Sequence, residues 1–418
     1  MSVLPSAPAP VPGACRSDFP LLQEVIQGRK LVYLDNAATT QKPETVLRRL
    51  DAYYRHENSN VHRGMYPLSR RATLAYESAR QTVARFIGAA SEREIVFTRG
   101  TTEGMNLVAQ AWGSEHLKPG DRILVGEFEH HSTLVPWHQA ARRTGAELVP
   151  IPLNEDFSGP DEVVLKAALA DPRTKVFAFT LVSNSLGITL DAERWCRESA
   201  RHRVLTVVDA AQAVGHLPVD VRNLGCDFLA FSGHKCAGPT GIGVLYGREE
   251  ALASLQPWQG GGEMIDRVTF EEITWKPAPF RFEAGTPAIA QAIGLAAALD
   301  YLSSMGLEAI RQHTEELGAY ALEKLREISG IRFLSPAPVA GPLVSFNLSG
   351  IHAHDAADLA GEAGVALRAG HHCCQPLMKR CGVPGTLRAS WYVYNSRDDI
   401  DALVTSLGDI QTFFRKNR

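Results

Sequence analysis

Short apolar runs that alternate with amphipathic stretches of helical length constrain the fold of this chain more than any other feature of its sequence. Six of these runs are predicted to be buried strands: Glu94–Thr98, Arg122–Val125, Val176–Thr180, Val204–Val208, Asp227–Phe231 and Gly243–Tyr246. Strands that alternate with helices favour a largely parallel sheet that carries helices on both faces. We therefore predict an α/β fold.

The chain is too long for one ordinary hydrophobic core, because it has 418 residues. We expect a large domain over residues 18–290, with about its first 15 residues packed on a smaller domain, and a small C-terminal α/β domain over residues 291–418. A long helix from Pro287 to about Ile328, broken near Gly306, should join the two. The small domain is expected to contain strands Leu343–Asn347 and Ala366–Arg368 and helices His354–Gly361 and Asp398–Phe414. Residues 1–17 are rich in Pro, Ala and Ser at their start and are predicted to be a disordered tail.

Composition excludes several classes of function. The formal net charge is −3, so no basic excess predicts a nucleic-acid surface. No apolar run approaches the roughly 18–20 residues of a membrane helix, and we expect no membrane partner. Seven scattered cysteines do not form a disulfide framework in a chain of this length. They indicate a reducing compartment, so we expect a cytoplasmic protein.

Chemically useful residues follow three of the predicted strands, where ligands bind in α/β sheets. Arg99–Glu103 opens a helix with a glycine and two threonines, which suits a phosphate group, although a plain helix cap would look the same. Asp209 ends an apolar strand, where a carboxylate is costly unless paired; it could also cap the next helix. Lys235 ends another strand inside a glycine-rich turn and is a candidate Schiff-base lysine, although most lysines are simply solvated.

Together these residues match the needs of a pyridoxal 5'-phosphate (PLP) site. An aspartate keeps the pyridine nitrogen protonated, so that the ring can accept electrons, and a lysine holds the aldehyde. The threonine-bearing helix start holds the phosphate. The combination is more specific than any one of its members.

From about Asp18 to its C-terminus the sequence closely resembles the cysteine desulfurases of the class V aminotransferase family, in particular the Suf-type (group II) branch. The matching motifs are Tyr33–Thr40, Val61–Gly64, Arg99–Gly104, Glu129–His131, Val182–Asn184, Phe231–Lys235, Phe282–Pro287 and Arg368–Cys373. The resemblance implies the PLP-dependent transferase fold type I, with a mostly parallel seven-stranded sheet and a smaller C-terminal domain.

The resemblance also implies residue roles. Lys235 would carry PLP as a Schiff base and move protons, and His130 would stack on the ring as a candidate proton shuttle. The other cofactor-binding residues would be Thr102, Asn184, Asp209, Gln212, Ser232 and His234, with Thr286 reaching the phosphate of the partner subunit in a homodimer. Arg388 would clamp the substrate carboxylate with its planar fork. His62, Arg63 and Asn184 would line the same pocket.

Cys373 is the expected sulfur acceptor. Its thiolate would attack the sulfur of bound L-cysteine, leaving alanine and a persulfide, which passes to an acceptor protein of the SufE or SufU kind for Fe–S cluster assembly. His371 and His372 would favour the thiolate if one were protonated. The short segment between Arg368 and Cys373 predicts a tight, protected loop. Residues 260–275 resemble a β-hairpin lobe that covers the partner's active site.

Several alternatives stay open at this point. Selenocysteine lyase is a possible secondary or alternative activity, whereas a kynureninase-like hydrolase or an aminotransferase has no need of a thiol at Cys373. A sulfur carrier without catalysis would not need Lys235 or Asp209. The run His371–Cys374 resembles a metal cluster, but adjacent residues converge poorly on one tetrahedral ion, so we expect no metal. Cys374, where the family usually has alanine, is either a persulfide relay or a small buried thiol.

Overall fold

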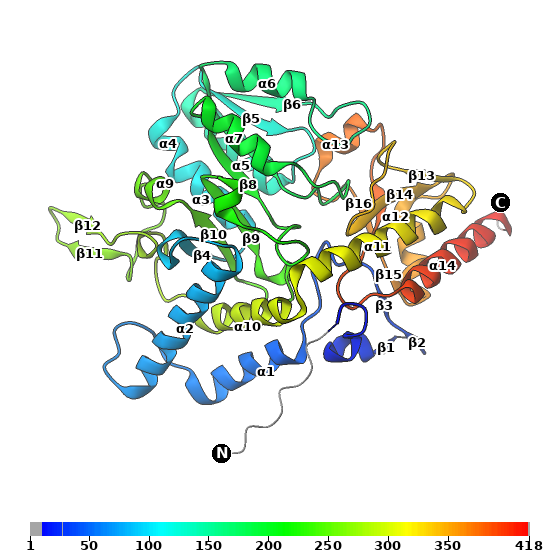
Figure 1. Ribbon diagram of the computed structural model, residues 1–418, viewed down its shortest axis with the longest axis horizontal. Coiled ribbons are helices and arrows are strands. Elements are labelled where there is room, and N and C mark those ends of the chain that lie inside the picture. The colour runs from blue at the N-terminus through cyan, green and yellow to red at the C-terminus, as the bar shows by residue number, and fades with distance from the viewer. Residues whose placement is uncertain (1–10, 27, 417–418) are drawn as a thin grey trace.

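A seven-stranded sheet forms the centre of the larger part of the molecule (Figure 1). The computed structural model describes residues 11–26 and 28–416. The strands lie in the order β4-β10-β9-β8-β7-β5-β6. Their bounds are β4 Ile95–Thr98, β5 Arg122–Gly126, β6 Glu147–Ile151, β7 Thr174–Thr180, β8 Leu205–Asp209, β9 Phe228–Ser232 and β10 Gly243–Gly247. All neighbours pair in parallel except β10, which is antiparallel to both β4 and β9. The predicted mostly parallel sheet is therefore confirmed.

Each of the six predicted strands is present with its ends shifted by at most two residues. The seventh strand, β6, was not predicted. It contains Pro150 and is mostly accessible, both of which are tolerated because β6 lies at the edge of the sheet.

Side chains alternate along the central strands between two cores. On β7, Val176 and Ala178 join a core with helices α3 (Thr101–Ala111) and α5 (His131–Thr144). Phe177 and Phe179 join a core on the other face with α2 (Pro67–Phe86) and α10 (Ile289–Met305). Burial on both faces explains why these strands are continuous apolar runs in the sequence.

The smaller domain is built on a four-stranded antiparallel sheet in the order β13-β14-β17-β16. These strands are β13 Ile331–Phe333, β14 Leu343–Leu348, β16 Arg368–Gly370 and β17 Thr386–Ser390. Helices α11 (Leu307–Arg326), α12 (Ala353–Glu362) and α14 (Arg397–Lys416) share its core. The predicted strand at Ala366–Arg368 is in fact two: β15 (Val365–Ala366) leaves the sheet to pair with β3 (Val32–Tyr33), and β16 stays in it.

The remaining elements are short or peripheral. They are β1 Val25–Ile26, β2 Arg29–Lys30, α1 Glu44–Ala52, a π-helical turn Tyr53–Glu57, α4 Gly113–His116, α6 Glu162–Ala170, α7 Ala192–Arg201, α8 Val221–Leu224, α9 Glu249–Ala253, β11 Ile265–Val268, β12 Ile273–Trp275 and α13 Gln375–Arg380. The hairpin of β11 and β12 projects from the large domain, at the left of Figure 1. Three-residue or four-residue turns of 3-10 helix lie at Arg16–Asp18, Pro20–Gln23, Glu92–Glu94, Gly233–Lys235 and Phe280–Phe282.

The two domains meet at a bend in the long helix. Helix α10 packs against α1 and α2, whereas α11 packs against α14. Gly306 lies between α10 and α11 with φ +87°, and the helix axes differ by 76°. We therefore propose that the boundary between the two domains lies at Gly306 rather than at residue 290.

Within the described residues no single helix is long and apolar enough to cross a membrane. The bent pair of α10 and α11 passes that test only when the two helices are taken together, by length and composition.

Residues 11–17 pack against the small domain, contrary to the predicted tail over residues 1–17. The Gly13 N–H donates to the carbonyl of Val393 at 2.6 Å, and Cys15 is buried. The prediction for residues 1–10 lies outside the described residues. The pairing of β3 with β15 agrees with the expectation that the start of the large domain packs on the small one.

Candidate active site

A cavity of about 310 Å³ opens at the carboxyl ends of β7, β8 and β9, against the small domain. It brings together most of the predicted site residues, namely Thr102, His130, Asn184, Asp209, Gln212, Ser232, His234, Lys235, Cys373 and Arg388. They come from chain segments nearly 290 residues apart. The edge of the large sheet, together with strand β17 and the Cys373 loop of the small domain, therefore builds the site.

Asp209 is buried at the end of β8. Its Oδ1 accepts the N–H of Ala211 at 2.9 Å, and its Oδ2 accepts the hydroxyls of Ser132 at 3.2 Å and Thr133 at 3.4 Å. Burial raises the pKa of this carboxyl, while these hydrogen bonds and Lys235 oppose the rise. Within the described chain Asp209 has no salt bridge. A buried carboxylate without a cation is costly, and a protonated pyridine nitrogen would supply the missing charge.

Lys235 ends a 3-10 turn that follows β9, and its side chain lines the cavity. Burial lowers the pKa of its ammonium group, Arg388 lowers it further, and the charge of Asp209 opposes both. A lysine whose pKa is lowered is more often uncharged near neutral pH and can attack an aldehyde.

His130 caps the start of α5 and faces the same cavity. Its Nδ1 accepts the N–H of Ser132 at 3.0 Å and lies 2.8 Å from the Ser132 hydroxyl. Burial, with Lys235 nearby, lowers the pKa of His130 to about 3. The imidazole is therefore neutral at physiological pH, and since its Nδ1 accepts the Ser132 N–H, its Nε2 carries the hydrogen.

Hydroxyl groups and a helix start line one end of the cavity. The Ser232 hydroxyl accepts the N–H of Thr101 at 2.8 Å and lies 2.7 Å from the Thr101 hydroxyl, while Thr102 is exposed in the first turn of α3. His234 stands beside them with its pKa lowered to about 4 by burial. Free N–H groups and the helix dipole of α3 suit a phosphate at this end. Thr101 belongs to the helix start that the sequence predicted for the phosphate, although only Thr102 was assigned to the cofactor by number.

Arg388 lies on β17 and is only 2% exposed. Its Nη1 donates to the carbonyl of Asn184 at 2.9 Å, its Nη2 lies 3.4 Å from Asp35, and its Nε has no partner among the described residues. Burial lowers the pKa of Arg388 to about 10. Asp35 also pairs with Arg368 at 3.0 Å, so one carboxylate holds two arginines at the edge of the cavity. No local sequence pattern predicts a role for Asp35, because its two arginine partners lie more than 330 residues away in the chain.

Cys373 lies in a loop between β16 and α13. All seven cysteines fall in the described part of the chain, and of these only Cys373 is exposed. Its N–H donates to Nδ1 of His371 at 3.1 Å, and its carbonyl accepts the N–H of His131 at 2.8 Å. The His372 ring turns away to the Thr386 hydroxyl at 2.8 Å, and burial lowers its pKa to about 3. His372 is therefore neutral and does not supply the positive charge that was considered for it.

Three predicted residues lie outside this cavity. His62 contacts Glu77 at 2.8 Å and Arg63 contacts Glu263 at 3.1 Å, and the N–H of His62 donates to the Thr73 hydroxyl of α2. The prediction that they line the pocket is therefore wrong for the cavity of their own chain. Thr286 is exposed and lines a separate cavity of about 490 Å³. Gln212 does line the site, but its amide nitrogen donates to the carbonyl of Ala37 at 2.7 Å.

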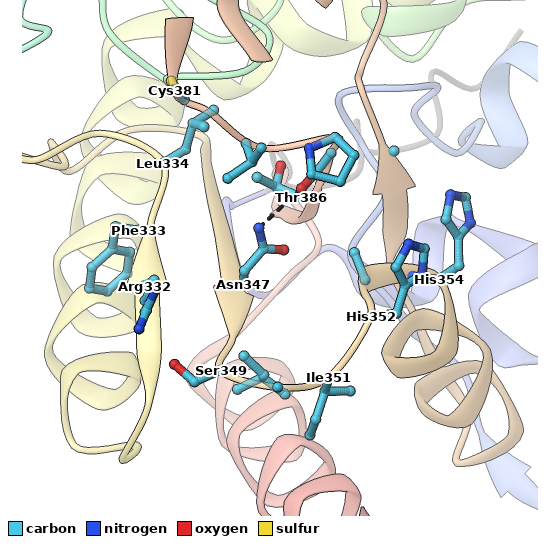
Figure 2. A pocket seen from close by; sticks show the side chains of 17 residues that line it. Arg332, Phe333, Leu334, Asn347, Ser349, Ile351, His352, His354, Cys381 and Thr386 are labelled. Atoms are coloured by element: carbon cyan, nitrogen blue, oxygen red, sulfur yellow. Dashed lines mark hydrogen bonds between the residues drawn. The ribbon is translucent and has the colours of Figure 1, made fainter. Parts of the chain in front are cut away.

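Another cavity, of about 360 Å³, lies wholly in the small domain (Figure 2). Asn347 crosses it and donates to the carbonyl of Gly385 at 3.0 Å, with His352 and His354 at its rim. This small-domain cavity contains none of the predicted site residues.

No cluster of three or more His, Cys, Asp or Glu side chains in the described ranges is placed to hold a metal ion.

A strand-end lysine, a buried strand-end carboxylate and a hydroxyl-lined helix start that share one cavity in an α/β fold define a PLP-dependent enzyme of fold type I. Residues 32–403 match the aminotransferase class-V family. The chain belongs to this family and uses PLP.

Several proteins to which this chain is similar are named cysteine desulfurases. A probable cysteine desulfurase of Halalkalibacterium halodurans is 49% identical, and the match covers 95% of this chain and 97% of that protein. A cysteine desulfurase of Synechococcus elongatus is 47% identical over 95% of this chain, which spans only 63% of that longer protein. The solved structure of the cysteine desulfurase CsdA of Escherichia coli is similar with a TM-score of 0.88 and 41% identity, covering 95% of this chain and 98% of that one.

Proposed function

We propose that this chain is a cysteine desulfurase of the Suf type, which converts L-cysteine to L-alanine and holds the sulfur as a persulfide on Cys373. The observation that carries the proposal is the position of Cys373, an exposed thiol that lines the same cavity as Lys235 and Arg388. A hydrolase or an aminotransferase of this family has no use for a thiol there. A pure sulfur carrier has no use for Lys235 and Asp209.

The residues fit the cofactor that the family uses. Asp209 would pair with the pyridine nitrogen and Lys235 would hold the aldehyde, while Ser232, Thr102 and His234 would hold the phosphate. Bound PLP supplies an electron sink for negative charge at the substrate carbon. Asn184 and Gln212 line the same cavity and would lie near the cofactor, although each already donates to a backbone carbonyl, at 2.7 Å in both cases.

The chain's own groups bind the substrate and move its protons. Arg388 is fixed by Asn184 and Asp35, so that its planar fork can bind the substrate carboxylate in one orientation. Burial of Lys235 favours its neutral amine, which can take and return the proton at the substrate α-carbon. His130 is neutral, and since its Nδ1 accepts the Ser132 N–H, its Nε2 carries a hydrogen that it can donate to a group in the cavity.

The sulfur step needs the thiolate of Cys373. Its sulfur attacks the substrate sulfur, an S–S bond forms, and the C–S bond of the substrate breaks. The electron pair of that bond stays with the substrate carbon, which later takes a proton to become the methyl group of alanine. The exposed loop then presents the persulfide to an acceptor.

An assay of alanine release tests this function. The purified holoenzyme with L-cysteine and a thiol reductant should release alanine and sulfide in equal amounts. Without the reductant, turnover should stop after one persulfide per active chain, on the peptide that contains Cys373, and a SufE-like or SufU-like acceptor should restore it. Absence of alanine would refute the proposal; alanine from selenocysteine alone would favour selenocysteine lyase.

We also propose that the sulfur is transferred to Fe–S cluster assembly in the cytoplasm. Loss of the activity of Fe–S enzymes in a deletion strain would test this part of the proposal.

We also propose that the enzyme is a homodimer. Thr286 lies on the surface, outside the active-site cavity of its own chain, and the hairpin of β11 and β12 carries the fully exposed Phe270 at its tip. Val268, Ile273 and Trp275 on the same hairpin are also exposed, and exposed apolar side chains that gather in this way suit burial against a second copy. Light scattering of the holoenzyme should give the mass of two chains. A monomer that releases alanine at full rate would contradict this proposal without affecting the chemistry.

A further inference from the structure

The loop that carries Cys373 holds two successive residues in the left-handed region. His372 has φ +50° and Cys373 has φ +57°, and neither is a glycine. Such residues are disfavoured because the β-carbon crowds the backbone, and they persist only where the surroundings fix them. The position of the reactive thiol therefore depends on the contacts on either side of it.

Asn184 makes one of these contacts with its side-chain nitrogen. Its Nδ2 donates to the carbonyl of His372 at 2.7 Å, directly before the reactive cysteine. The backbone carbonyl of Asn184 accepts a hydrogen bond from Nη1 of Arg388 at 2.9 Å. One residue thus connects the substrate-binding arginine to the Cys373 loop.

Cys374 makes the complementary contact with the other atom of the same amide. Its side chain is fully buried, and its Sγ donates to Oδ1 of Asn184 at 3.2 Å. Its N–H donates to the carbonyl of His371 at 2.8 Å. Burial raises the pKa of the Cys374 thiol to about 12. A protonated, buried thiol is a hydrogen-bond donor and a poor nucleophile, which speaks against a persulfide relay.

We propose that Cys374 is a positioning residue for the Cys373 loop. Its thiol fixes the orientation of the Asn184 side-chain amide, because the amide oxygen accepts from Cys374 while the amide nitrogen donates to the His372 carbonyl. The fixed amide thereby holds the loop in its left-handed conformation. Alanine at this position would lack the donor. The kinetic consequence rests on the proposed function, whereas the effect on the loop does not.

The test compares Cys374→Ala with Cys374→Ser, which keeps a donor of similar size. Hydrogen–deuterium exchange of the holoenzyme is followed in peptides covering residues 371–375, and kcat and KM for alanine release are measured on the same samples. Cys226→Ala is the matched control, because Cys226 is equally buried but lies just before the start of β9, beside Cys196 and Asp227, whereas the cavity lies at the other end of that strand.

Cys374→Ala should raise loop exchange by about fivefold, the effect of one lost hydrogen bond, and lower kcat by a similar factor with KM nearly unchanged. Cys374→Ser should restore both, and Cys226→Ala should change neither. Unchanged loop exchange in Cys374→Ala, failure of serine to rescue, or a persulfide on Cys374 in the unmodified enzyme would each overturn the proposal. If the unmodified enzyme made no alanine, the proposed function would fail, but the exchange comparison would still decide the role of Cys374.

Discussion

Replacement of Lys235 by alanine or by arginine is expected to lower alanine release from cysteine by at least about 10³-fold. Among the described residues that line the cavity Lys235 is the only lysine, so no other amine is placed to hold the cofactor or to move the substrate proton. Arginine keeps a positive charge near Asp209, but its guanidinium stays protonated and cannot attack an aldehyde. Equal loss in both variants would therefore identify the amine chemistry, rather than the charge, as the essential property.

Lys42 provides a control for this prediction. It is also partly buried, and this burial lowers its pKa to about 8, but it lies outside the cavity and its Nζ donates to the carbonyls of Thr40 and His234. Borohydride reduction followed by peptide mapping should fix the cofactor on the peptide of Lys235 in the unmodified enzyme and in Lys42→Arg. Retention of more than a tenth of the activity in Lys235→Ala would contradict the assigned role.

Much of this site could be predicted because its residues occupy positions that local sequence defines. Asp209 is the last residue of the buried strand β8, Lys235 lies three residues after the buried strand β9, and Thr102 lies in the first turn of a helix that follows β4. The carboxyl ends of parallel strands meet at one edge of a sheet, so residues at these positions gather without knowledge of strand order. The same reasoning failed for β6, whose proline and partial exposure are features of an edge strand.

Other parts of the site depend on contacts that no local pattern encodes. Asp35 reaches Arg368 and Arg388 only because β3 docks on the small domain through β15. His62 and Arg63 were assigned to the pocket through a motif, yet their turn is bound to α2 and faces Glu77 and Glu263. The left-handed conformation of the Cys373 loop likewise results from side chains that are distant in the sequence.

Replacement of Cys373 by serine or alanine should be as damaging as loss of Lys235, by at least about 10³-fold in alanine release, but it should leave the cofactor in place. The reason is chemical: the C–S bond of the substrate breaks only if another sulfur accepts the substrate sulfur, and a serine hydroxyl is too weakly acidic to provide the anion at neutral pH. Absorbance of the bound cofactor and its response to added cysteine should persist, which separates loss of the acceptor from loss of the cofactor site.

Cys381→Ser is the matched control, because Cys381 is partly exposed and lies shortly after the same loop, while burial raises the pKa of its thiol to about 11. It should release alanine at the normal rate. Iodoacetamide should label Cys373 first in the unmodified enzyme, and labelling should parallel the loss of activity. If Cys373→Ser and Cys373→Ala both release alanine normally, the acceptor lies elsewhere. Since the other cysteines are buried or partly buried, such a result would require the loop to open and expose Cys374, or the sulfur to leave without a protein acceptor.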